Sequence, residues 1–520
     1  MPHRRSRAVR ARQAHIAQMA GTPPAGGGRQ RFTPADAAAL QANLVGTVVL
    51  PTSADYNNGR QLSDPVWQSF PSIIVYCQVF DDVWHTLAFA RQFGLHVLCR
   101  SGGHSTAGFS VDDDALVLDT SRIAYCAVDW SNRVATVGAG TSLGALNAVL
   151  DGFQLHTPGG ACPDVCVAGH MMGGGYGWTS REFGMNCDNV IEMLVMLADG
   201  RTVRANADMN ADLYWAMCGG TGNNFGVLLE LKYQLFDLWK VWGFGFSYPM
   251  NQAAAALHLL QNDYMLDAGP RELGYQVAWI TRNGEKRLVV RGMYHGDPDA
   301  GRKLVAPLVK LPGATNEVDT IDTYNSLNEG LIDKPYSYPD IPDNAQEDKL
   351  SGYLARPLDL GEWKGLTDAA QRDTLGWAFA NLEVYGGAIN ARPVNSNAFV
   401  HRNVYCDWVQ DVFWTNGAER ETAEQFLDEM VRAWQPYLNG HANQDYPRRS
   451  QTNYRWLFFG EAFNTLLFVK NKYDPDNFFH FPQSISPQPP GEEPRATSPS
   501  LFSDAGIAEE PFSRGFPKQA

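Results

Sequence analysis

Residues 157–177 read TPGGACPDVCVAGHMMGGGYG, a run in which 7 of 21 residues are glycine. Glycine lets the main chain approach a ligand closely and adopt positive φ, so that several N–H groups can converge on one anion. The run follows a helical stretch at 142–150 and precedes a strand at 190–197. We therefore expect it to form a loop that binds an anion at one end of a sheet.

Three shorter glycine loops accompany this run, each next to an expected strand: RSGGHS at 100–105, GAGT at 138–141 and GGTGNNFG at 219–226. Any one of them alone is an ordinary turn. Together they favour an extended anion such as a pyrophosphate. None fits G-x-x-x-x-G-K-[ST], and no suitably placed acidic residue follows 173–177, which disfavours a P-loop and a nicotinamide site.

Two reactive side chains lie within these loops rather than in strands. His104 stands inside a glycine loop, where no hydrophobic core would hold it. Cys162 lies between Ala161 and Pro163, whereas Cys77 and Cys99 fall in expected strands and are predicted to be structural. Loop placement makes His104 and Cys162 available for chemistry.

The overall composition indicates a two-domain globular protein. The chain has 520 residues, too many for one core, and 44% of them are hydrophobic. The net charge of −14 disfavours binding to nucleic acid or to anionic membranes. No apolar run approaches the roughly 20 residues that span a bilayer. The eight cysteines show neither a disulfide framework nor a metal-ligand spacing, so we expect no metal.

Both ends of the chain are expected to be flexible. Residues 1–31 are rich in Arg, Gly and Pro, and residues 487–520 are rich in Pro, Ser and Glu. No apolar segment follows the N-terminal arginines, so a signal peptide is not indicated and a cytoplasmic location is expected. The twin arginines at 4–5 keep export as the alternative.

The character of the chain changes near residue 240. Expected strands at 273–280, 287–294, 376–384 and 401–413 alternate with expected helices at 251–264, 300–311 and 418–438. The glycine loops become rare in this half. We predict a second domain built on an antiparallel sheet covered by helices.

The glycine loops and the C-terminal run resemble a known family, the berberine bridge enzyme-like FAD-linked oxidases of the vanillyl-alcohol oxidase (PCMH-type) superfamily. The motifs that carry the resemblance occur in the family's order over about 45–485: RSGGHS at 100–105, GACPDV at 160–165, GHMMGGGYG at 169–177, GNNFGV at 222–227 and KYDPDNFF at 472–479.

The resemblance implies an α+β fold in which a PCMH-type FAD-binding domain of two α/β subdomains (32–240) is followed by a substrate domain (241–450). Residues 451–486 would return to the FAD domain. FAD would be bonded covalently to His104 and Cys162, with Cys166 as the less favoured thiol. The other implied FAD-binding residues are Arg100, Ser101, Gly102, Gly103, Ser105, Gly169, Gly174, Gly175, Gly177, Asn189, Val190, Gly226 and Val227.

The implied activity is an FAD-dependent oxidoreductase, most simply an oxidase. A small-molecule alcohol, either a carbohydrate or a secondary metabolite, would give a hydride to FAD, and O2 would be the final acceptor, giving H2O2. The alternatives are a dehydrogenase that uses another acceptor and a flavin-binding protein without turnover. The oligomeric state is left open.

The catalytic base is the point at which the sequence departs from the family. The position of the family's C-terminal tyrosine is Phe458, which cannot accept a proton. Five other residues are candidates for this role: Tyr454, Asp407, Tyr405, Tyr385 and Glu383. Tyr405 and Asp407 are two residues apart in an expected strand, so both should face the same side, either toward the flavin or toward the helices.

Overall fold

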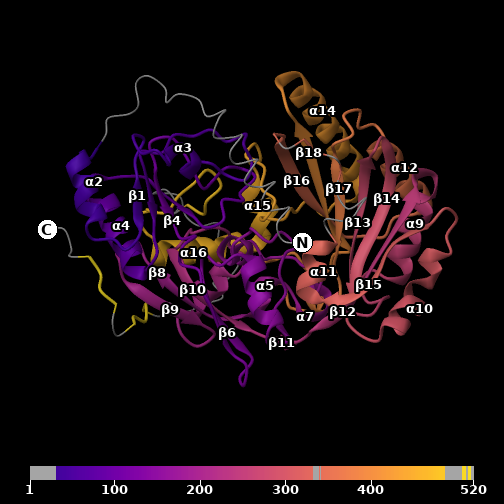
Figure 1. Ribbon diagram of the computed structural model, residues 1–520, viewed down its shortest axis with the longest axis horizontal. Helices are drawn as coiled ribbons and strands as arrows, with labels where there is room; N and C mark the ends of the chain where they lie inside the picture. Colours follow the sequence, from indigo (N-terminus) through magenta and orange to yellow (C-terminus); the bar gives the residue numbers. More distant parts are fainter. Residues whose placement is uncertain are drawn as a thin grey trace.

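The computed structural model describes residues 31–331, 339, 341–342, 344–486, 506–510 and 513–516. Two lobes lie side by side (Figure 1), one formed by the first half of the chain with the C-terminal helices and the other by residues 240–434. The mixture of parallel and antiparallel sheets with helices confirms the predicted α+β class. Except for Arg31, the N-terminal tail predicted at 1–31 lies outside the described residues.

The first subdomain is a four-stranded sheet whose strand order is β1 (Thr47–Val49), β2 (Ile73–Tyr76), β4 (Leu116–Asp119) and β3 (Val97–Arg100). Strands β2, β4 and β3 are parallel. Helix α4 (Phe80–Phe93) connects β2 to β3, with two aspartates in its first turn and Gly94 at φ +59° ending it. This crossover places the RSGGHS loop at the end of β3. The smaller helices are α2 (Pro34–Gln41) and α3 (Tyr56–Gly59).

The second subdomain is an antiparallel sheet in the order β5 (Cys126–Asp129), β6 (Val134–Gly138), β10 (Val227–Gln234), β8 (Val190–Met196) and β9 (Thr202–Asn206). The glycine-rich run 157–177 crosses its end. The remaining elements are α5 (Leu143–Asp151), β7 (Leu155–His156), α6 (Val167–Met172), α7 (Ser180–Phe183), the 3-10 helix η1 (Asn186–Asn189), α8 (Ala211–Met217) and β11 (Phe236–Asp237).

The second lobe is a seven-stranded antiparallel sheet in the order β15 (Thr315–Thr323), β12 (Lys240–Pro249), β14 (Glu285–Tyr294), β13 (Leu273–Arg282), β17 (Phe379–Val384), β18 (Cys406–Trp414) and β16 (Gln346–Leu354). The antiparallel sheet and the four predicted strands are confirmed, with shifted ends. Strands β12, β15 and β16 were not predicted. The edge strand β15 is largely exposed and therefore polar, which hides the apolar alternation on which the prediction depended.

The two faces of this sheet have different surroundings. Helices α9 (Met250–Asp263), α12 (Leu360–Ala370) and α14 (Gly417–Trp434) cover one face, where a core rich in tryptophan is buried. The other face looks toward the first lobe (Figure 1). Because side chains alternate along a strand, Trp408 packs under the helices while Val409 faces the first lobe. The other elements here are α10 (Pro298–Val309), α11 (Tyr324–Gly330), α13 (Ala388–Ala391) and η2 (Gln435–Tyr437).

The C-terminal helices α15 (Tyr454–Phe459), η3 (Gly460–Ala462) and α16 (Phe463–Tyr473) pack against the first lobe, in yellow in Figure 1. Lys470 of α16 is fully buried there. Its ammonium donates to the carbonyls of Asn224 and Phe479, each at 2.6 Å, and pairs with Asp474 at 2.7 Å. These bonds join the glycine loop at 219–226 to the C-terminal segment.

Part of the tail that was expected to be flexible lies against the first lobe. The Phe516 amide donates to the Asp199 carbonyl at 2.6 Å, and the Trp84 indole donates to the Arg514 carbonyl at 2.8 Å. Glu510 pairs with Arg204 of the edge strand β9. Residues 506–510 and 513–516 therefore cover this edge, whereas the sequence predicted a tail without such contacts.

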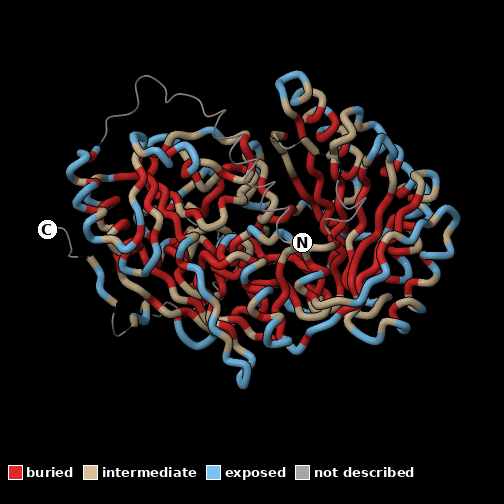
Figure 2. The backbone as a smooth tube through the Cα atoms, viewed as in Figure 1, coloured by how far each residue is buried: buried red, intermediate tan, exposed pale blue. Residues whose placement is uncertain are grey.

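Buried backbone runs through both lobes and continues between them (Figure 2). In the part of the chain that the structure describes, no helix combines the length and apolar character needed to cross a bilayer.

Candidate active site

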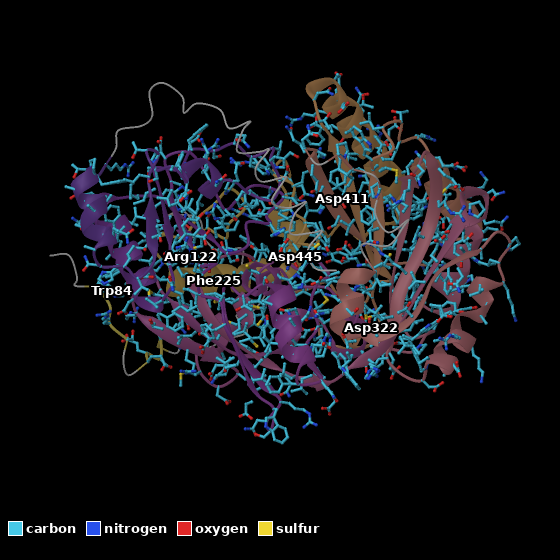
Figure 3. The ribbon with its side chains drawn as sticks, in the orientation of Figure 1. Trp84, Arg122, Phe225, Asp322, Asp411 and Asp445 are labelled. Carbon is cyan, nitrogen blue, oxygen red and sulfur yellow. The ribbon has the colours of Figure 1, made fainter. Side chains whose placement is uncertain are left out.

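A cavity of about 530 Å³ lies between the two lobes. Its first wall comes from the loop after β3 and the run 160–178. Its second wall is the uncovered face of the seven-stranded sheet, and Figure 3 labels Asp411 on that sheet and Asp445 where the lobes meet. The second wall carries the polar side chains Gln276, Arg291, Glu347, Lys349, Asn381, Glu383 and Asp411.

The RSGGHS loop contributes its backbone and His104 to the cavity. Arg100 turns away from it, because its guanidinium forms a buried ion pair with Asp119. Gly103 has φ +69°, a conformation that favours glycine, and its carbonyl accepts from the Ser63 amide at 3.0 Å. The cavity is lined by the predicted residues that follow Arg100: Ser101, Gly102, Gly103, His104 and Ser105.

The two thiols of the glycine-rich run differ in their surroundings. Cys162 is exposed and lines the cavity. Cys166 is buried, and its thiol donates to the Gly140 carbonyl with a sulfur–oxygen distance of 3.2 Å. Burial, reinforced by nearby Asp119 and Asp164, raises the pKa of Cys166 to about 12. Since the thiolate is the reactive form, Cys162 is the better placed of the two.

Several residues that the resemblance implied as FAD ligands lie behind the cavity wall. The Gly175 amide donates to Asp445 at 3.1 Å, and the Asn189 side chain donates to the carbonyls of Phe183 and Met185. Of the implied set, the wall includes Gly169 and Gly177 but not Arg100, Gly174, Gly175, Asn189, Val190, Gly226 or Val227. These seven residues lie outside the wall of this cavity, and their part in FAD binding stays a prediction.

The strongest candidate for a proton acceptor in the cavity is a carboxylate–phenol pair. The Tyr446 hydroxyl donates to Oε1 of Glu383 on β17 at 2.8 Å. Both residues line the cavity, and Glu383 is only 5% exposed. Behind it lies Asp407, its cross-strand neighbour on β18, whose Oδ2 accepts from the Asn443 side chain at 2.9 Å.

Burial raises the pKa of three carboxyl groups in this region, those of Glu383, Asp407 and Asp445. It raises the pKa of Glu383 to about 7, although the Tyr446 hydrogen bond and the charge of Lys349 act in the opposite direction. The pKa of Asp407 is raised well above its usual value by burial and then by Glu383. Burial does the same to the pKa of Asp445. Glu383 is therefore the carboxyl that changes charge near neutral pH, as a general base requires.

Lysine supplies positive charge beside this cluster. The Lys349 ammonium lies 2.8 Å from Glu347 and 3.0 Å from Asp411, and 5.5 Å from the centre of the Tyr446 ring. All four side chains line the cavity. This wall can both donate and accept hydrogen bonds, which suits a substrate with several hydroxyl groups.

The other candidates for the base do not reach the cavity wall. The Tyr454 hydroxyl donates to the Ser484 carbonyl at 2.9 Å, and Tyr405 packs against the core under the helices. Tyr385 is fully buried with its hydroxyl 3.5 Å from that of Tyr353. The side chains of Tyr405 and Asp407 thus do not face the same side. Tyr405 precedes β18, so the alternation of side chains along that strand does not extend to it. Phe458 does line the cavity.

Tyr446 was not predicted, although Glu383 was considered. It lies in the irregular segment between α14 and α15, where neither periodicity nor a motif marks it. Only the folded chain brings it to Glu383, 63 residues away in sequence. Among the described residues, no group of three or more His, Cys, Asp or Glu side chains could hold a metal ion.

Comparisons with known proteins agree with the predicted family and fold. A family model for an FAD binding domain matches residues 71–206, and one described as berberine and berberine like matches residues 437–486. A carbohydrate oxidase of Microdochium nivale is 28% identical over 84% of this chain and 92% of its own. Berberine bridge enzyme-like 4 of Arabidopsis thaliana is 27% identical over 85% and 89%. The solved structure of wild-type Physcomitrella patens BBE-like 1 has a TM-score of 0.77 at 26% identity, covering 87% of this chain and 99% of that one.

Proposed function

Because the chain is a berberine bridge enzyme-like, FAD-dependent oxidoreductase of the PCMH superfamily that acts on CH–OH groups, we propose that it oxidises carbohydrate hydroxyls with O2 and releases H2O2. The Glu383–Tyr446 pair carries this proposal, since it faces the same cavity as His104 and Cys162. The carbohydrate oxidase relative supports the substrate class, as does the hydrogen-bonding wall around Lys349.

The residues of the cavity fit a covalently bound FAD. His104 and Cys162 lie on two separate loops, and both residues line the cavity. His104 and Cys162 would each hold FAD by one bond, formed with loss of one hydrogen from the side chain and one from the flavin. Each bond would thus release two electrons and two protons, which O2 would accept to give one H2O2. Cys162 is preferred over Cys166 because the latter thiol is buried and hydrogen-bonded.

FAD held at His104 and Cys162 would supply the hydride acceptor for the substrate carbon and the route for two electrons to O2. The protein removes the hydroxyl proton, so that C–OH becomes C=O. Glu383 in its charged form takes that proton, and the Tyr446 hydroxyl bonded to Oε1 fixes the carboxylate orientation. Trp178 and Phe379 give the cavity apolar surfaces for the faces of a sugar ring.

Substrate screening with the purified yellow protein tests this function. Mono- and oligosaccharides and simple alcohols are added in air, and H2O2 is measured by a peroxidase-coupled dye. Stoichiometric H2O2 with a sugar supports the oxidase. Flavin reduction by the sugar without H2O2 indicates a dehydrogenase with another acceptor. No reduction by any compound favours the flavin-binding protein without turnover.

A further inference from the structure

The loop that carries Cys162 is held from the opposite lobe by helix α11. This helix, Tyr324–Gly330, follows β15 of the second lobe (residues 240–434), which is called the substrate lobe from here on. The Asn328 side chain donates to the Gly160 carbonyl at 3.2 Å, and the Tyr324 hydroxyl donates to the Gly159 carbonyl at 3.4 Å. Both side chains are almost fully buried. The bonds to the other lobe thus end two residues before Cys162.

The two side chains on α11 are themselves fixed. The one hydrogen of the Tyr324 hydroxyl is shared between the Gly159 carbonyl and Oδ1 of Asn328, which lies 3.2 Å from the hydroxyl, so that the amide nitrogen of Asn328 points at Gly160. The Tyr324 ring packs on the imidazole of His156, with ring centres 4.1 Å apart. That imidazole is hydrogen-bonded to the Thr179 hydroxyl at 2.6 Å.

The first lobe holds the same loop from its other side. The Asn186 side chain donates to the Pro158 carbonyl at 2.6 Å, and the Gly160 amide donates to Nε2 of His170 at 3.0 Å. Beyond Cys162, the Gly144 amide of α5 donates to the Pro163 carbonyl at 3.0 Å. The backbone is therefore fixed on both sides of Cys162, and α11 supplies the part of this support that comes from the substrate lobe.

We propose that Asn328 and Tyr324 are positioning residues that hold the Cys162 loop in place for attachment to FAD. The inference rests on the proposed function, since it requires flavin on Cys162. Two glycines precede Ala161 and give this backbone many accessible conformations unless side chains restrict it. Forming a bond at one flavin carbon requires the sulfur to be held close to it. Contact with the substrate lobe therefore helps attachment at Cys162. It does not help attachment at His104, because these bonds of α11 do not reach the loop that carries His104.

Peptide mapping of the purified holoprotein tests the proposal, with His104 as an internal reference in each sample. Asn328→Asp keeps the size of the side chain and removes the donor to Gly160, and Tyr324→Phe removes only the hydroxyl. Ser326→Ala is the matched control, because its hydroxyl bonds Asp322 on the exposed side of the same helix. We expect Asn328→Asp to lower the fraction of Cys162 that carries flavin about fivefold, the effect of one lost hydrogen bond. Tyr324→Phe should have a smaller effect, and His104 occupancy should stay unchanged in all variants.

Three results would overturn the inference, and they are distinguishable. Wild-type protein without flavin on Cys162 would refute the proposed attachment, and the role of α11 with it. Flavin on wild-type Cys162 together with unchanged occupancy in Asn328→Asp and Tyr324→Phe would refute the role of α11 alone. Equal losses at Cys162 and His104 would indicate that these residues only hold the lobes together. Circular dichroism and thermal unfolding of each variant confirm that the protein mapped is folded.

Discussion

The hydroxyl of Tyr446 donates a 2.8 Å hydrogen bond to Oε1 of Glu383. Tyr446 comes from the irregular segment that precedes α15, and Glu383 comes from the middle of the seven-stranded sheet. Their bond places a carboxyl with a pKa of about 7 at the wall of the cavity between the lobes. We propose that this pair serves in place of the tyrosine that the resembling family has at the position of Phe458 in this chain.

Replacing the carboxyl of Glu383 should stop the removal of the substrate proton. We expect Glu383→Gln to slow anaerobic flavin reduction about 100-fold or more, the usual contribution of a general base, with flavin content unchanged. Stopped-flow absorbance with saturating substrate measures this step directly. Glu347→Gln, at the same wall but paired with Lys349, is the control and should change KM more than kcat. An unchanged reduction rate in Glu383→Gln would assign the proton to another group.

The rate of flavin reduction should increase with pH through about 7, since Glu383 accepts a proton only when it is charged and its pKa is about 7. The Tyr446 hydrogen bond lowers that pKa. Tyr446→Phe should therefore move the midpoint of the pH–rate profile to higher pH. Tyr454→Phe is the control, because its hydroxyl bonds Ser484 away from the cavity. A midpoint that stays fixed in Tyr446→Phe would contradict the role of this pair.

Removing one attachment residue should leave the other bond to FAD intact. In His104→Ala we expect flavin only on Cys162, and in Cys162→Ala only on His104. The double variant should release all its flavin on acid precipitation, measured by absorbance of the supernatant. Cys166→Ala is the control for the second thiol and should keep both bonds, since Cys166 is buried and bonded to Gly140. Flavin lost from Cys166→Ala instead of Cys162→Ala would exchange the roles of the two thiols.

A buried ion pair between the lobes should be a major contributor to stability. Both Asp188 oxygens accept from Arg402, at 2.7 and 2.8 Å, and neither side chain is exposed. Arg402→Leu removes the two close donors and leaves the buried carboxylate with Arg392, 3.6 Å away, as its remaining cation, so we expect a loss near the lower end of about 3–5 kcal/mol in the free energy of unfolding. Urea titration followed by tryptophan fluorescence measures it. Adding Asp188→Asn should recover part of the loss, and the absence of any recovery would contradict this explanation.

Deleting residues 506–520 should uncover the edge of β9 without affecting the cavity. The deletion removes the carbonyl that accepts from Trp84 and the ring of Phe516 packed 5.0 Å from the Trp84 ring. We expect a loss of about 2 kcal/mol in stability, since these contacts lie near the surface, and unchanged flavin content and turnover. Thermal unfolding and the rate of H2O2 formation are the measurements. A large loss of turnover would show that the segment acts on the site.

The sequence predicted the elements whose signals are local. Helix α4 has acidic residues in its first turn and Gly94 after its last, and both features are readable without the fold. In the seven-stranded sheet, the four strands β13, β14, β17 and β18 were predicted from their apolar content, whereas the interior strand β12 was not. The edge strand β15 was missed. It pairs with a neighbour on one side only, its other side faces solvent, and its residues are polar. The docked segment near Phe516 was also missed, because its stability comes from partners more than 300 residues away.

By itself, the sequence predicted the resemblance to the family, the α+β class, FAD as the cofactor and the two loops that present His104 and Cys162. These features depend on short motifs, in which glycine conformation and a few reactive side chains are encoded over adjacent residues. The tertiary structure alone decided that Glu383 and not Asp407 faces the cavity, that Tyr446 bonds Glu383, and that α11 contacts the Cys162 loop. Such contacts join residues distant in sequence, and burial between two lobes sets the pKa of Glu383, so no local pattern records them.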